Sequence, residues 1–506
     1  MKSFPISLFF IILIGILFTS CRKDFEFEPS NGSELRFSKD TVYLDTVFSN
    51  IGSSTYTLKV YNTSNKDIKI PSLQLGKGEN SNYRLMVDGI PGKVFNNIEL
   101  LAKDSMYIFV ETTVNIQQQT NLNEYLYTDQ ILFQAGTKQQ KVELVTLIKD
   151  AVFLYPQKFD NGTTETLPIN DSEVYGFYLD ENDPVNGNEL IWTANKPYVI
   201  YGYAAVAPNK TLQIQPGTQV HFHADSGLII SNTATINSMG TLDNPIVFQG
   251  DRLEPSFENI TGQWDMIWLS VGSKGQFENT TIKNANRGLF INKNNGTVNL
   301  HNVQIYNCAE FGILGVAANI KGTNVVTNNC GSAALNLSYG GSYHFIHSTF
   351  ANYWNRPNQT TVAIDNYDGS SEFAIQKALF QNCIIYGSTN ESLIMKSNGT
   401  NNFNIKFENT LIKFIDYNNT VFGQFPYAFN NNTYFNNCLI ARNNQEYRPY
   451  FYNTTKNQMM ITDLATALIG VGNTNYAQQV PADIMGNSRI NAPDLGAYQH
   501  VVQPEE

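Results

Sequence analysis

The chain is poor in charge, and the charge it carries is mostly negative. Charged residues make up 15% of its 506 residues, and 33 basic residues stand against 44 acidic ones, for a formal net charge of −11. Soluble globular domains usually carry about 25% charged residues. A negative chain without a basic stripe lacks the electrostatic footprint of nucleic-acid binding, so we expect no nucleic-acid partner.

Cysteine and histidine are scarce as well. The chain has 5 Cys and 6 His, with no C-x-x-C pair and no histidine at zinc spacing, so the sequence predicts no metal centre and no cofactor. His221 and His223 alternate along one predicted strand, which an exposed strand face explains. The absence of a G-x-S-x-G element removes the nucleophile elbow of the α/β-hydrolases.

The chain is rich in β-type sequence instead. It contains 27 Tyr and 32 Phe, and Asn and Gly interrupt the apolar runs. Aromatic and β-branched residues favour strands, while Asn and Gly favour turns. The length exceeds that of one ordinary hydrophobic core. The sequence therefore predicts an all-β protein with at least two domains.

Residues 1–20 have the pattern of a signal peptide that ends before Cys21. Lys2 is followed by an apolar run from Ile6 to Phe18 and then by Thr19-Ser20-Cys21. A basic start, a short apolar stretch and small residues at the cleavage point are typical of secretion. The segment around Cys21 resembles the lipobox of bacterial lipoproteins, whose cysteine is lipidated. An ordinary signal peptide or a membrane span with an incidental cysteine is the alternative, but the apolar run is short for a span.

The lipobox resemblance implies a membrane partner reached through acyl chains. Several chains on Cys21 would anchor the protein durably, because each buried methylene adds about 0.8 kcal/mol. We read residues 21–33 as a tether. Its Arg22-Lys23 pair, followed by acidic residues, is similar to the signals that send Bacteroidetes lipoproteins to the cell surface, although a solvated acidic leader is the simpler explanation of such a segment. We expect a lipid-anchored outer-membrane protein exposed at the surface.

Residues 34–150 alternate short β-type runs, such as Tyr56–Val60, with turn clusters. This spacing predicts a β-sandwich, and residues 45–63 resemble the opening of immunoglobulin-like modules of extracellular bacterial proteins, which implies a spacer. Residues 151–190 show less order and predict a linker or flap. The acidic residues 180–183 in that segment offer oxygen ligands for calcium, but no EF-hand spacing is present and a solvated loop is the simpler interpretation.

A degenerate repeat begins near Phe277. Its segments start at seven apolar residues: Phe277, Leu300, Ile320, Phe345, Phe380, Phe407 and Phe435. Five residues after each start stands another apolar residue, and two residues after most starts stands an Asn, with Gly322 and His347 as the exceptions. The apolar spacing of a helical solenoid is absent. The repeat therefore predicts strands that stack about 4.8 Å apart and bury Phe and Ile together.

Asn suits the bends between such strands, because it tolerates the left-handed region and stacked amides hydrogen-bond to one another. Together with the alternating run Leu212–Val220, the repeat resembles the right-handed parallel β-helix of pectate-lyase-like surface proteins. The ending Asn491–Tyr498 resembles the Asp-Ile-Gly-Ala-Tyr ending of many bacterial β-helix proteins, which implies a cap on the last coil. We accordingly expect residues 191–500 to form a right-handed parallel β-helix.

The repeat also bears on the cysteines. Cys383 and Cys438 share one repeat position two coils apart, a separation of roughly 10 Å. A disulfide needs Cα atoms within about 7 Å, so both are predicted to be free. Cys308 and Cys330 fall one coil apart in matching Asn-Cys sequences, and for them a disulfide remains open.

Candidate catalytic residues are few. Asp365, Asp368 and Glu372 form the densest acidic group of the repeat, with Arg356 nearby in the sequence. Polysaccharide enzymes need paired carboxylates, or calcium beside a basic residue, and this group could supply either. A polar loop with Asp-Gly turn chemistry is the simpler explanation.

Aromatic side chains are the candidates for ligand binding. Trp264, Trp268, Tyr353 and Trp354 could stack on sugar rings, although core filling is the better explanation for any single one of them, because aromatic residues dominate cores. Tyr353 and Trp354 lie where a predicted strand enters a loop, which favours their exposure.

Two functions remain open at this point. The first is a surface protein that binds glycan or acts as a structural or adhesive scaffold, with a polysaccharide or a surface protein as partner. The second is a polysaccharide lyase or glycoside hydrolase, because one fold hosts many activities. Two carboxylates and a basic group converging in one groove would favour the enzyme, and scattered acids would favour binding.

Overall fold

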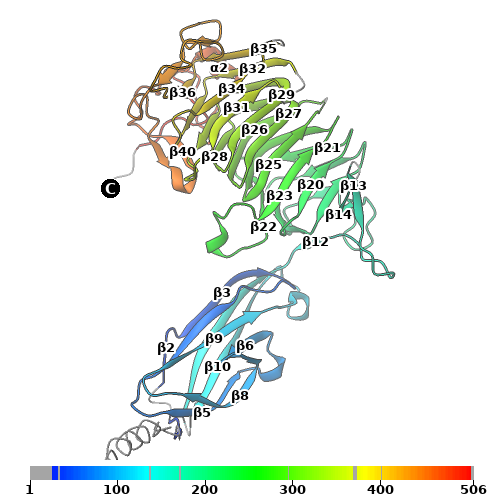
Figure 1. The fold of residues 1–506 in the computed structure, drawn as a ribbon. Helices are drawn as coiled ribbons and strands as arrows, with labels where there is room; N and C mark the ends of the chain where they lie inside the picture. Colours follow the sequence, from blue (N-terminus) through cyan, green and yellow to red (C-terminus); the bar gives the residue numbers. More distant parts are fainter. Residues whose placement is uncertain are drawn as a thin grey trace, which may run out of the picture. The chain divides into compact units, whose positions relative to one another are not determined.

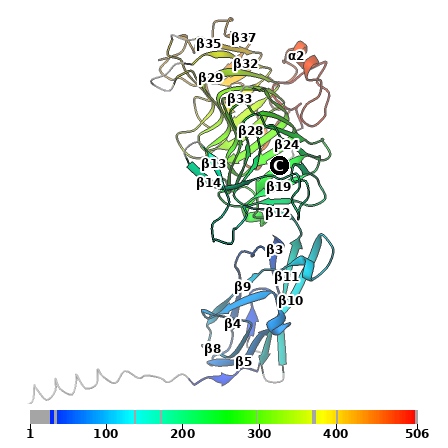
Figure 2. The ribbon, with the colours of Figure 1, turned by 90° about the vertical axis from the view of Figure 1, so that its right-hand side faces the viewer.

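The computed structural model describes residues 26–31, 35–135, 138–169, 172–294, 296–367, 373–399 and 402–502. The predicted signal peptide and Cys21 lie outside the described residues. The chain divides into two compact units, Met1–Lys149 and Asp150–Glu506, and strands dominate both (Figure 1, Figure 2). The protein is therefore all-β, as predicted. Among the described residues, no helix has the length and apolar character needed to cross a membrane.

The first unit contains two sheets. One is built from β1 (Glu28–Pro29), β5 (Ile68–Leu75), β10 (Glu124–Ala135), β11 (Lys138–Lys149), β3 (Thr41–Phe48) and β8 (Val94–Leu100), and the other from β2 (Leu35–Phe37), β4 (Tyr56–Asn62), β9 (Ser105–Thr112), β6 (Tyr83–Val87) and β7 (Ile90–Gly92). Alternate residues of both sheets enter one hydrophobic cluster, for example Ile108 of β9 and Ile131 of β10. Because β1 pairs with β5, residues 28–29 belong to a sheet, and the prediction of a tether over 21–33 is wrong for that part.

The second unit is dominated by one sheet of 27 strands. Its strands are β12 (Val152–Leu154), β13 (Thr166–Ile169), β14 (Ser172–Tyr178), β15 (Ile191–Trp192), β16 (Tyr198–Ile200), β17 (Tyr203–Val206), β18 (Thr211–Ile214), β19 (Gln219–Phe222), β20 (Gly227–Ile230), β21 (Thr235–Met239), β22 (Ile246–Gly250), β23 (Trp264–Leu269), β24 (Lys274–Lys283), β25 (Ala285–Asn292), β26 (Val298–Cys308), β27 (Phe311–Thr323), β28 (Val326–Cys330), β29 (Ala333–Ile346), β30 (Thr349–Asn352), β31 (Thr360–Asp365), β32 (Ile375–Gln381), β33 (Ile384–Gly387), β34 (Leu393–Lys396), β35 (Phe403–Glu408), β36 (Leu411–Lys413), β37 (Phe435–Asn436) and β38 (Leu439–Ala441).

Apart from the antiparallel β13–β14 hairpin, the pairing within this sheet is parallel. From β14 to β21 each strand pairs with the strand three places further along the chain, as in β15–β18–β21–β24 and β17–β20–β23. The long strand β24 pairs with β21 along its first half and with β22 along its second half. The chain thus returns to the same position at each pass and lays one strand beside the last.

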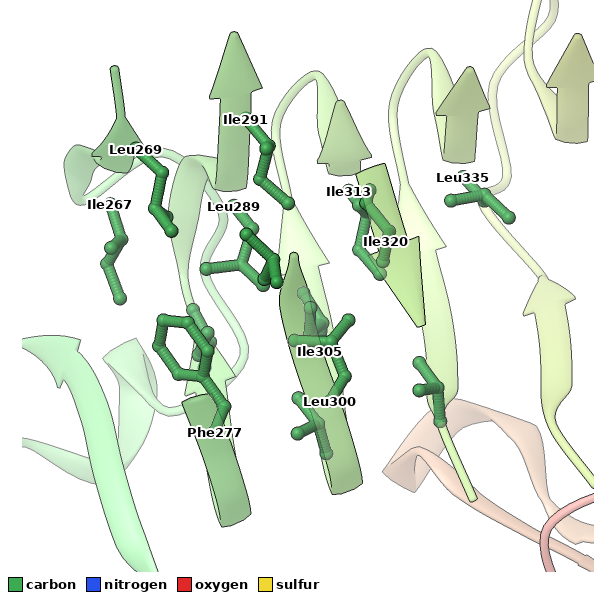
Figure 3. Packing of buried hydrophobic residues seen from close by; sticks show 14 of the residues in the cluster. Ile267, Leu269, Phe277, Leu289, Ile291, Leu300, Ile305, Ile313, Ile320 and Leu335 are labelled. Atoms are coloured by element: carbon green, nitrogen blue, oxygen red, sulfur yellow. The ribbon is translucent and has the colours of Figure 1, made fainter. Parts of the chain in front are cut away.

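The interior of the sheet is a stack of apolar side chains. Residues of β23, β25 and β27 face residues of β24 and β26 across it (Figure 3). The strands place Phe277, Leu300, Gly322, Phe345, Phe380, Phe407 and Phe435 in one register column. The rings of Phe380 and Phe407 are stacked with their centroids 5.0 Å apart. The predicted start at Ile320 is wrong by two residues, because Gly322 takes that place.

With Gly322 in place of Ile320, the residue two places further on becomes Asn324, and His347 is then the one exception to Asn at this position. We call the column of residues two places further on the Asn279 row: Asn279, Asn302, Asn324, His347, Asn382, Asn409 and Asn437. All seven have a positive φ, between 44° and 54°. Asn302 Nδ2 donates to Asn279 Oδ1 at 3.0 Å, and Asn324 Nδ2 donates to Asn302 Oδ1 at 2.8 Å. The predicted left-handed bends and stacked amides are confirmed.

The bounds predicted for the two segments around the repeat need correction. β12 pairs with β16, and β14 pairs with β17, so much of residues 151–190 belongs to the sheet and is neither linker nor flap. At the other end the sheet stops at Ala441, well before the predicted residue 500. Periodicity missed the beginning because the first strands are short and separated by long polar loops, and the predicted end rested on the resemblance of Asn491–Tyr498 to β-helix endings.

Residues 442–502, which we call the C-terminal segment, have a different structure. They include the hairpin β39 (Phe451–Asn453)–β40 (Gln458–Ile461) and the short helix α2 (Thr474–Gln479). Ala497 N donates to Thr349 Oγ1 at 2.9 Å, and Gly496 N donates to Asn382 O at 2.8 Å. The segment containing Asn491–Tyr498 therefore lies along the side of the stacked strands, and the prediction that it caps the last coil is wrong.

The four described cysteines are free, which confirms the prediction for Cys383 and Cys438. Cys308 and Cys330 are register partners on β26 and β28, both fully buried, and they form no disulfide. The neighbouring Cys330 thiol and burial together raise the pKa of Cys308 well above its usual range.

The remaining described helices are short 3-10 turns: η1 (Gly78–Asn80), η2 (Ile116–Gln118), η3 (Pro255–Phe257) and η4 (Thr454–Lys456). Only η3 bears on the sites described below.

Candidate functional site

An apolar row runs across the outer surface of the long sheet. Trp268 of β23 pairs in register with Ile229 of β20 on one side and with Phe290 of β25 on the other, and Leu314 of β27 continues the line. Their sequence neighbours Ile267, Leu269 and Leu289 are fully buried, so the alternation of a strand turns these four side chains outward. We call Ile229, Trp268, Phe290 and Leu314 the Trp268 row.

The row is only partly covered. Val174 and Ile169 of the β13–β14 hairpin pack against the Ile229 end, whereas Trp268, Phe290 and Leu314 remain partly exposed. The rings of Trp268 and Phe290 stack with centroids 5.7 Å apart and planes inclined by 23°. The described structure thus presents two stacked, nearly parallel rings on neighbouring strands.

Polar side chains flank the row along the beginning of the same strands. Tyr203 donates a hydrogen bond to Asp265, which also accepts one from Asn286 Nδ2 at 3.3 Å. On the next strands, Arg287 Nε donates to Glu310 Oε2 at 2.7 Å. Burial, reinforced by the carboxylate of Asp265, raises the pKa of the Tyr203 hydroxyl, so this hydroxyl stays protonated and keeps its donor role.

This combination suits a neutral or weakly charged ligand with an apolar face and polar edges. Aromatic faces bind extended apolar surfaces, and the carboxylate–guanidinium pair supplies both acceptors and donors at one edge. The indole N–H of Trp268 is buried and has no hydrogen-bond partner among the described residues. A sugar ring has this arrangement of an apolar face with hydroxyls at its edge.

A cavity of about 320 Å³ lies where the strands of the row begin, beneath the loop that connects β22 to β23. Its lining includes Arg252, Glu254, Glu258, Gln263 and Lys283. Gln263 directly precedes β23, and Lys283 ends β24, so the cavity lies at the bend from which the strands of the Trp268 row begin.

The predicted aromatic candidate Trp264 is a core residue. Its side chain is 1% exposed, its ring stacks on Phe222 at 4.3 Å, and its Nε1 donates to Lys283 O at 2.9 Å. The prediction that Trp264 stacks on sugar is therefore wrong. Trp264 and Trp268 are four residues apart, but a change of register between Met266 and Ile267 puts them on opposite faces of β23.

Tyr353 and Trp354 lie elsewhere on the unit. Tyr353 packs edge-on against Phe451 of the C-terminal segment at 6.0 Å, and burial raises the pKa of its hydroxyl. Trp354 is partly exposed, with the guanidinium of Arg356 5.9 Å from its ring. Tyr353 is thus taken up by packing, while Trp354 and Arg356 form a small separate patch.

The acidic candidates do not come together in the described structure. Asp365 ends β31 and accepts hydrogen bonds from Ser338 Oγ at 2.8 Å and Tyr339 N at 3.1 Å. Burial raises its pKa, and these bonds partly offset that effect. Asp368 and Glu372 lie outside the described residues. Asp365 therefore serves its own neighbourhood, and no described carboxylate joins it.

The acidic loop 180–183 uses its carboxylates locally. Asp180 Oδ1 accepts from Asn182 N at 2.9 Å, Asp183 Oδ1 accepts from Asn186 N at 2.6 Å, and Glu181 pairs with Lys210. No group of three or more His, Cys, Asp or Glu residues that could hold a metal ion is found in the part of the chain that the structure describes.

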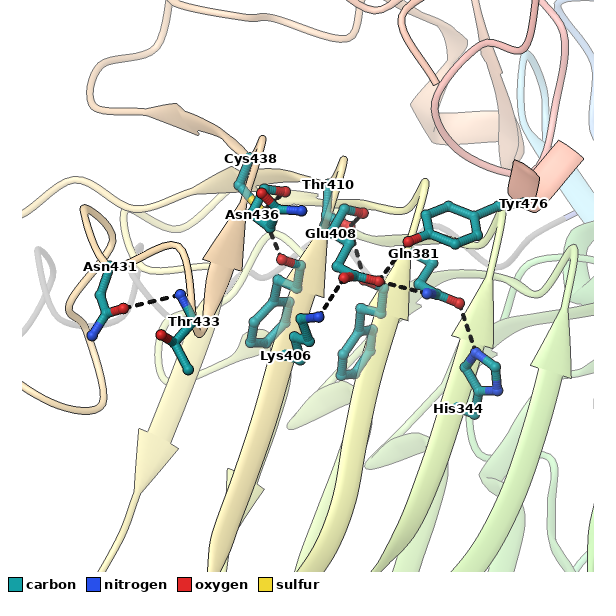
Figure 4. A network of polar contacts seen from close by, with 12 residues as sticks. His344, Gln381, Lys406, Glu408, Thr410, Asn431, Thr433, Asn436, Cys438 and Tyr476 are labelled. Atoms are coloured by element: carbon teal, nitrogen blue, oxygen red, sulfur yellow. Dashed lines mark hydrogen bonds and ion pairs between the residues drawn. The ribbon is translucent and has the colours of Figure 1, made fainter. Parts of the chain in front are cut away.

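A second polar network surrounds Glu408 (Figure 4). Its Oε2 accepts from Gln381 Nε2 at 2.6 Å and from Tyr476 of α2 at 2.6 Å, and its Oε1 pairs with Lys406 at 2.6 Å. Burial alone would raise the pKa of Glu408, but these three contacts hold it below its usual range. Because the carboxylate is fully engaged, it fixes α2 to the sheet and is not available to a ligand.

The sequence patterns missed most of the Trp268 row and its polar edge. No sequence motif marks Phe290, Arg287 or Glu310, so the sequence did not predict them as site residues. The signal that could have found Phe290 is the alternation of Leu289, Phe290 and Ile291, which leaves Phe290 on the face opposite the two buried residues. Trp268 gives no such signal, because simple alternation would place it on the same face as Trp264 and only the change of register inside β23 turns it outward.

No family model and no curated protein matches the chain. Solved structures with short similarities include a family 123 glycoside hydrolase from Clostridium perfringens at 9% identity and TM-score 0.17, over 22% of this chain and 23% of that one. A protein of unknown function from Porphyromonas gingivalis matches at 12% identity and TM-score 0.16, over 24% and 55% of the two chains. A Pseudomonas fluorescens alkylpurine DNA glycosylase matches at 14% identity and TM-score 0.14, over 22% and 30%. Likenesses this weak carry no conclusion about fold or function.

Proposed function

We propose that the chain is a lipid-anchored outer-membrane protein, exposed at the cell surface, that binds glycan. In this proposal the first unit is an immunoglobulin-like β-sandwich that acts as a spacer, and the second is a right-handed parallel β-helix that presents the Trp268 row. The parallel, periodic pairing of the long sheet supports the β-helix, since a chain that returns to the same position at each pass winds around one axis.

One observation carries the binding function. Two partly exposed aromatic rings, Trp268 and Phe290, stack in register on the outer surface of a parallel sheet, with Asp265, Arg287 and Glu310 at one edge. The interior of the same unit is already filled by other aromatic residues, so packing does not require these two rings on the outside. Their position favours an extended ligand that lies across the strands.

Glycan binding is tested with the soluble chain that begins at residue 22. We expect binding on a glycan array, and Trp268→Ala should weaken binding to the selected glycan about two- to tenfold, because stacking on one aromatic ring contributes about 0.5–1.5 kcal/mol. Phe109→Ala is the matched control: Phe109 is 37% exposed and lies beside Tyr107 on the first unit. Equal binding by the Trp268→Ala variant and the parent protein would reject the site.

The anchor has its own experiment. Lipidation at Cys21 predicts that the full chain partitions into detergent and incorporates radiolabelled palmitate, and that Cys21→Ser loses both, because only a thiol forms the thioether. Protease digestion of intact cells then separates surface exposure from a location facing the periplasm.

A second candidate function is polysaccharide cleavage, and one observation favours it. Two carboxylates, Glu254 and Glu258, line the cavity at the start of the strands of the row together with Arg252 and Lys283. Glu254 is engaged by Arg252 through two contacts, at 2.8 and 3.2 Å, which leaves Glu258 as the candidate acid. Release of unsaturated or reducing sugars that Glu258→Gln abolishes and Glu278→Gln preserves would establish the enzyme.

A further inference from the structure

Hydrogen bonds fix the loop that covers the cavity at the start of the strands of the Trp268 row. Gln263 Nε2 donates to Phe257 O at 2.7 Å and to Ile260 O at 2.9 Å. Asn284 Nδ2 donates to Glu258 O at 3.0 Å and to Ile260 O at 2.8 Å. Two amide side chains thus fix the backbone of the loop 251–263 over the end of β24, and the cavity is a built feature of the fold.

Two of the four charged residues that line the cavity are paired with one another. Arg252 forms a two-point pair with Glu254, and its guanidinium stacks on the ring of Phe257 at 4.0 Å. Glu254 is buried, whereas Glu258 is exposed at the rim. The arginine and its partner cancel one another, and the charge of Glu258 is screened by water.

Lys283 is the one cation of the cavity lining that has no ion-pair partner among the described residues. Its side chain is half-buried in the cavity lining, and its ammonium has no hydrogen bond or ion pair with any described residue. Burial lowers its pKa, and the more distant Glu258 offsets this only in part. A half-buried ammonium without a partner has lost water and gained no contact in exchange. A ligand that brings an anionic oxygen into the cavity would remove that penalty.

We propose that this cavity binds the acid group of a saccharide, a carboxylate or a sulfate ester, through Lys283. The inference rests on the proposed glycan binding and names the class of glycan: an acidic one whose neutral rings lie on the Trp268 row. Lys283 and Arg287 are four residues apart at the β24–β25 bend, and Gln263 and Asp265 are two apart at the start of β23. The cavity therefore precedes the polar edge of the row along both strands.

The test measures the accessibility of Lys283 directly. Brief acetylation with acetic anhydride, followed by peptide mass spectrometry, gives the labelling rate of Lys283 relative to Lys274, an exposed lysine at the other end of β24. The probes are D-glucuronate, galactose 6-sulfate and D-glucose at matched ionic strength. A probe at ten times its Kd should slow labelling of Lys283 about tenfold and leave Lys274 unchanged.

Each outcome decides a point. Protection by glucuronate assigns the carboxylate, and protection by galactose 6-sulfate assigns the sulfate ester. Equal labelling with all three probes, or equal protection by glucose, overturns the inference. Lys283→Met should bind an acidic glycan no better than its carboxyl-reduced or desulfated form, while Lys283→Arg should keep the preference.

The inference and the function on which it rests can fail separately. Trp268→Ala should leave the protection of Lys283 by the monosaccharides unchanged. Protection of Lys283 without Trp268-dependent binding of polymer would reject the Trp268 row alone. Trp268-dependent binding that is indifferent to acid groups would reject the Lys283 cavity alone.

Discussion

Two surfaces of the same long sheet are used in opposite ways. At the Asn279 row, polar side chains bond to one another and to the C-terminal segment, as when Asn473 N donates to Asn382 Oδ1 at 2.8 Å. At the Trp268 row, aromatic side chains of β23 and β25 remain partly exposed, and the buried indole N–H of Trp268 has no described partner. The two rows have the same strand spacing and differ in what covers them.

The comparison separates structural from functional surface. The bend at the Asn279 row needs a left-handed residue, which Asn tolerates, and the side-chain amides of successive passes bond to one another, as Asn302 does to Asn279. That requirement recurs at every pass, and so does the residue. The outer face of a strand has no such requirement, because its backbone is paired on both sides. The backbone does not require aromatic residues there, which makes the Trp268 row the better candidate for a ligand-binding surface.

The largest expected effect lies in neither row but in the interior that supports both. Phe380→Ala removes a ring that stacks on Phe345 at 5.4 Å and on Phe407 at 5.0 Å. It should lower the free energy of unfolding by about 3–5 kcal/mol. All four Trp residues of the chain, Trp192, Trp264, Trp268 and Trp354, belong to the second unit. Tryptophan fluorescence during urea unfolding therefore measures this unit alone.

The control for Phe380 is Phe290→Ala in the Trp268 row, which should cost under about 1 kcal/mol because the ring is partly exposed. A similar loss of unfolding free energy for both variants would contradict the distinction between the buried register column that contains Phe380 and the partly exposed Trp268 row.

The next effect concerns the attachment of the C-terminal segment. Tyr476→Phe removes a hydrogen bond of 2.6 Å to the carboxylate of Glu408 and should cost about 1–2 kcal/mol. The pKa of Glu408 is lowered in the folded protein, so its contribution is present above its unfolded pKa of about 4.3 and is lost as the pH falls through the folded value. Protease cleavage within residues 442–502 should therefore increase in the variant at neutral pH and in the parent protein as the pH falls below about 4.3.

Much of the fold follows from the sequence because folding itself imposes the repeat. Phe380, Phe407 and Phe435 recur since each must fill the same slot, and Asn382 and Asn409 recur since each makes the same bend. The start misassigned to Ile320 shows the limit: at Gly322 the slot is filled by the ring of Phe345 from the next pass, and a glycine leaves no apolar mark in the sequence.

The candidate site was less predictable because its residues do not recur from one pass to the next. Phe290, Arg287 and Glu310 occur once each, so no periodic comparison isolates them. Trp264 and Trp268 look alike in the sequence, and only the irregular register inside β23 distinguishes a buried ring from an exposed one. Lys283 becomes notable only when the loop 251–263 closes over it, which is a contact that residue types alone do not reveal.

The smallest expected effect is a test of His347, the one residue of the Asn279 row that is not Asn. Burial, with the nearby Arg489, holds the pKa of His347 well below its usual range, and a contact with Gly496 O only partly opposes this. As the pH falls below about 6.5, His347 becomes protonated in the unfolded chain but stays neutral in the folded protein, so the free energy of unfolding should decrease. His347→Asn should flatten this dependence between pH 7 and pH 5, at a small cost at pH 7 from the lost contact. Thermal unfolding followed by tryptophan fluorescence measures it, with His500→Asn as control because that ring is 41% exposed. An unchanged pH dependence would mean that the Asn279 row accommodates a charged imidazole. The contrast between the hydrogen-bonded, covered Asn279 row and the partly exposed Trp268 row would then be weaker.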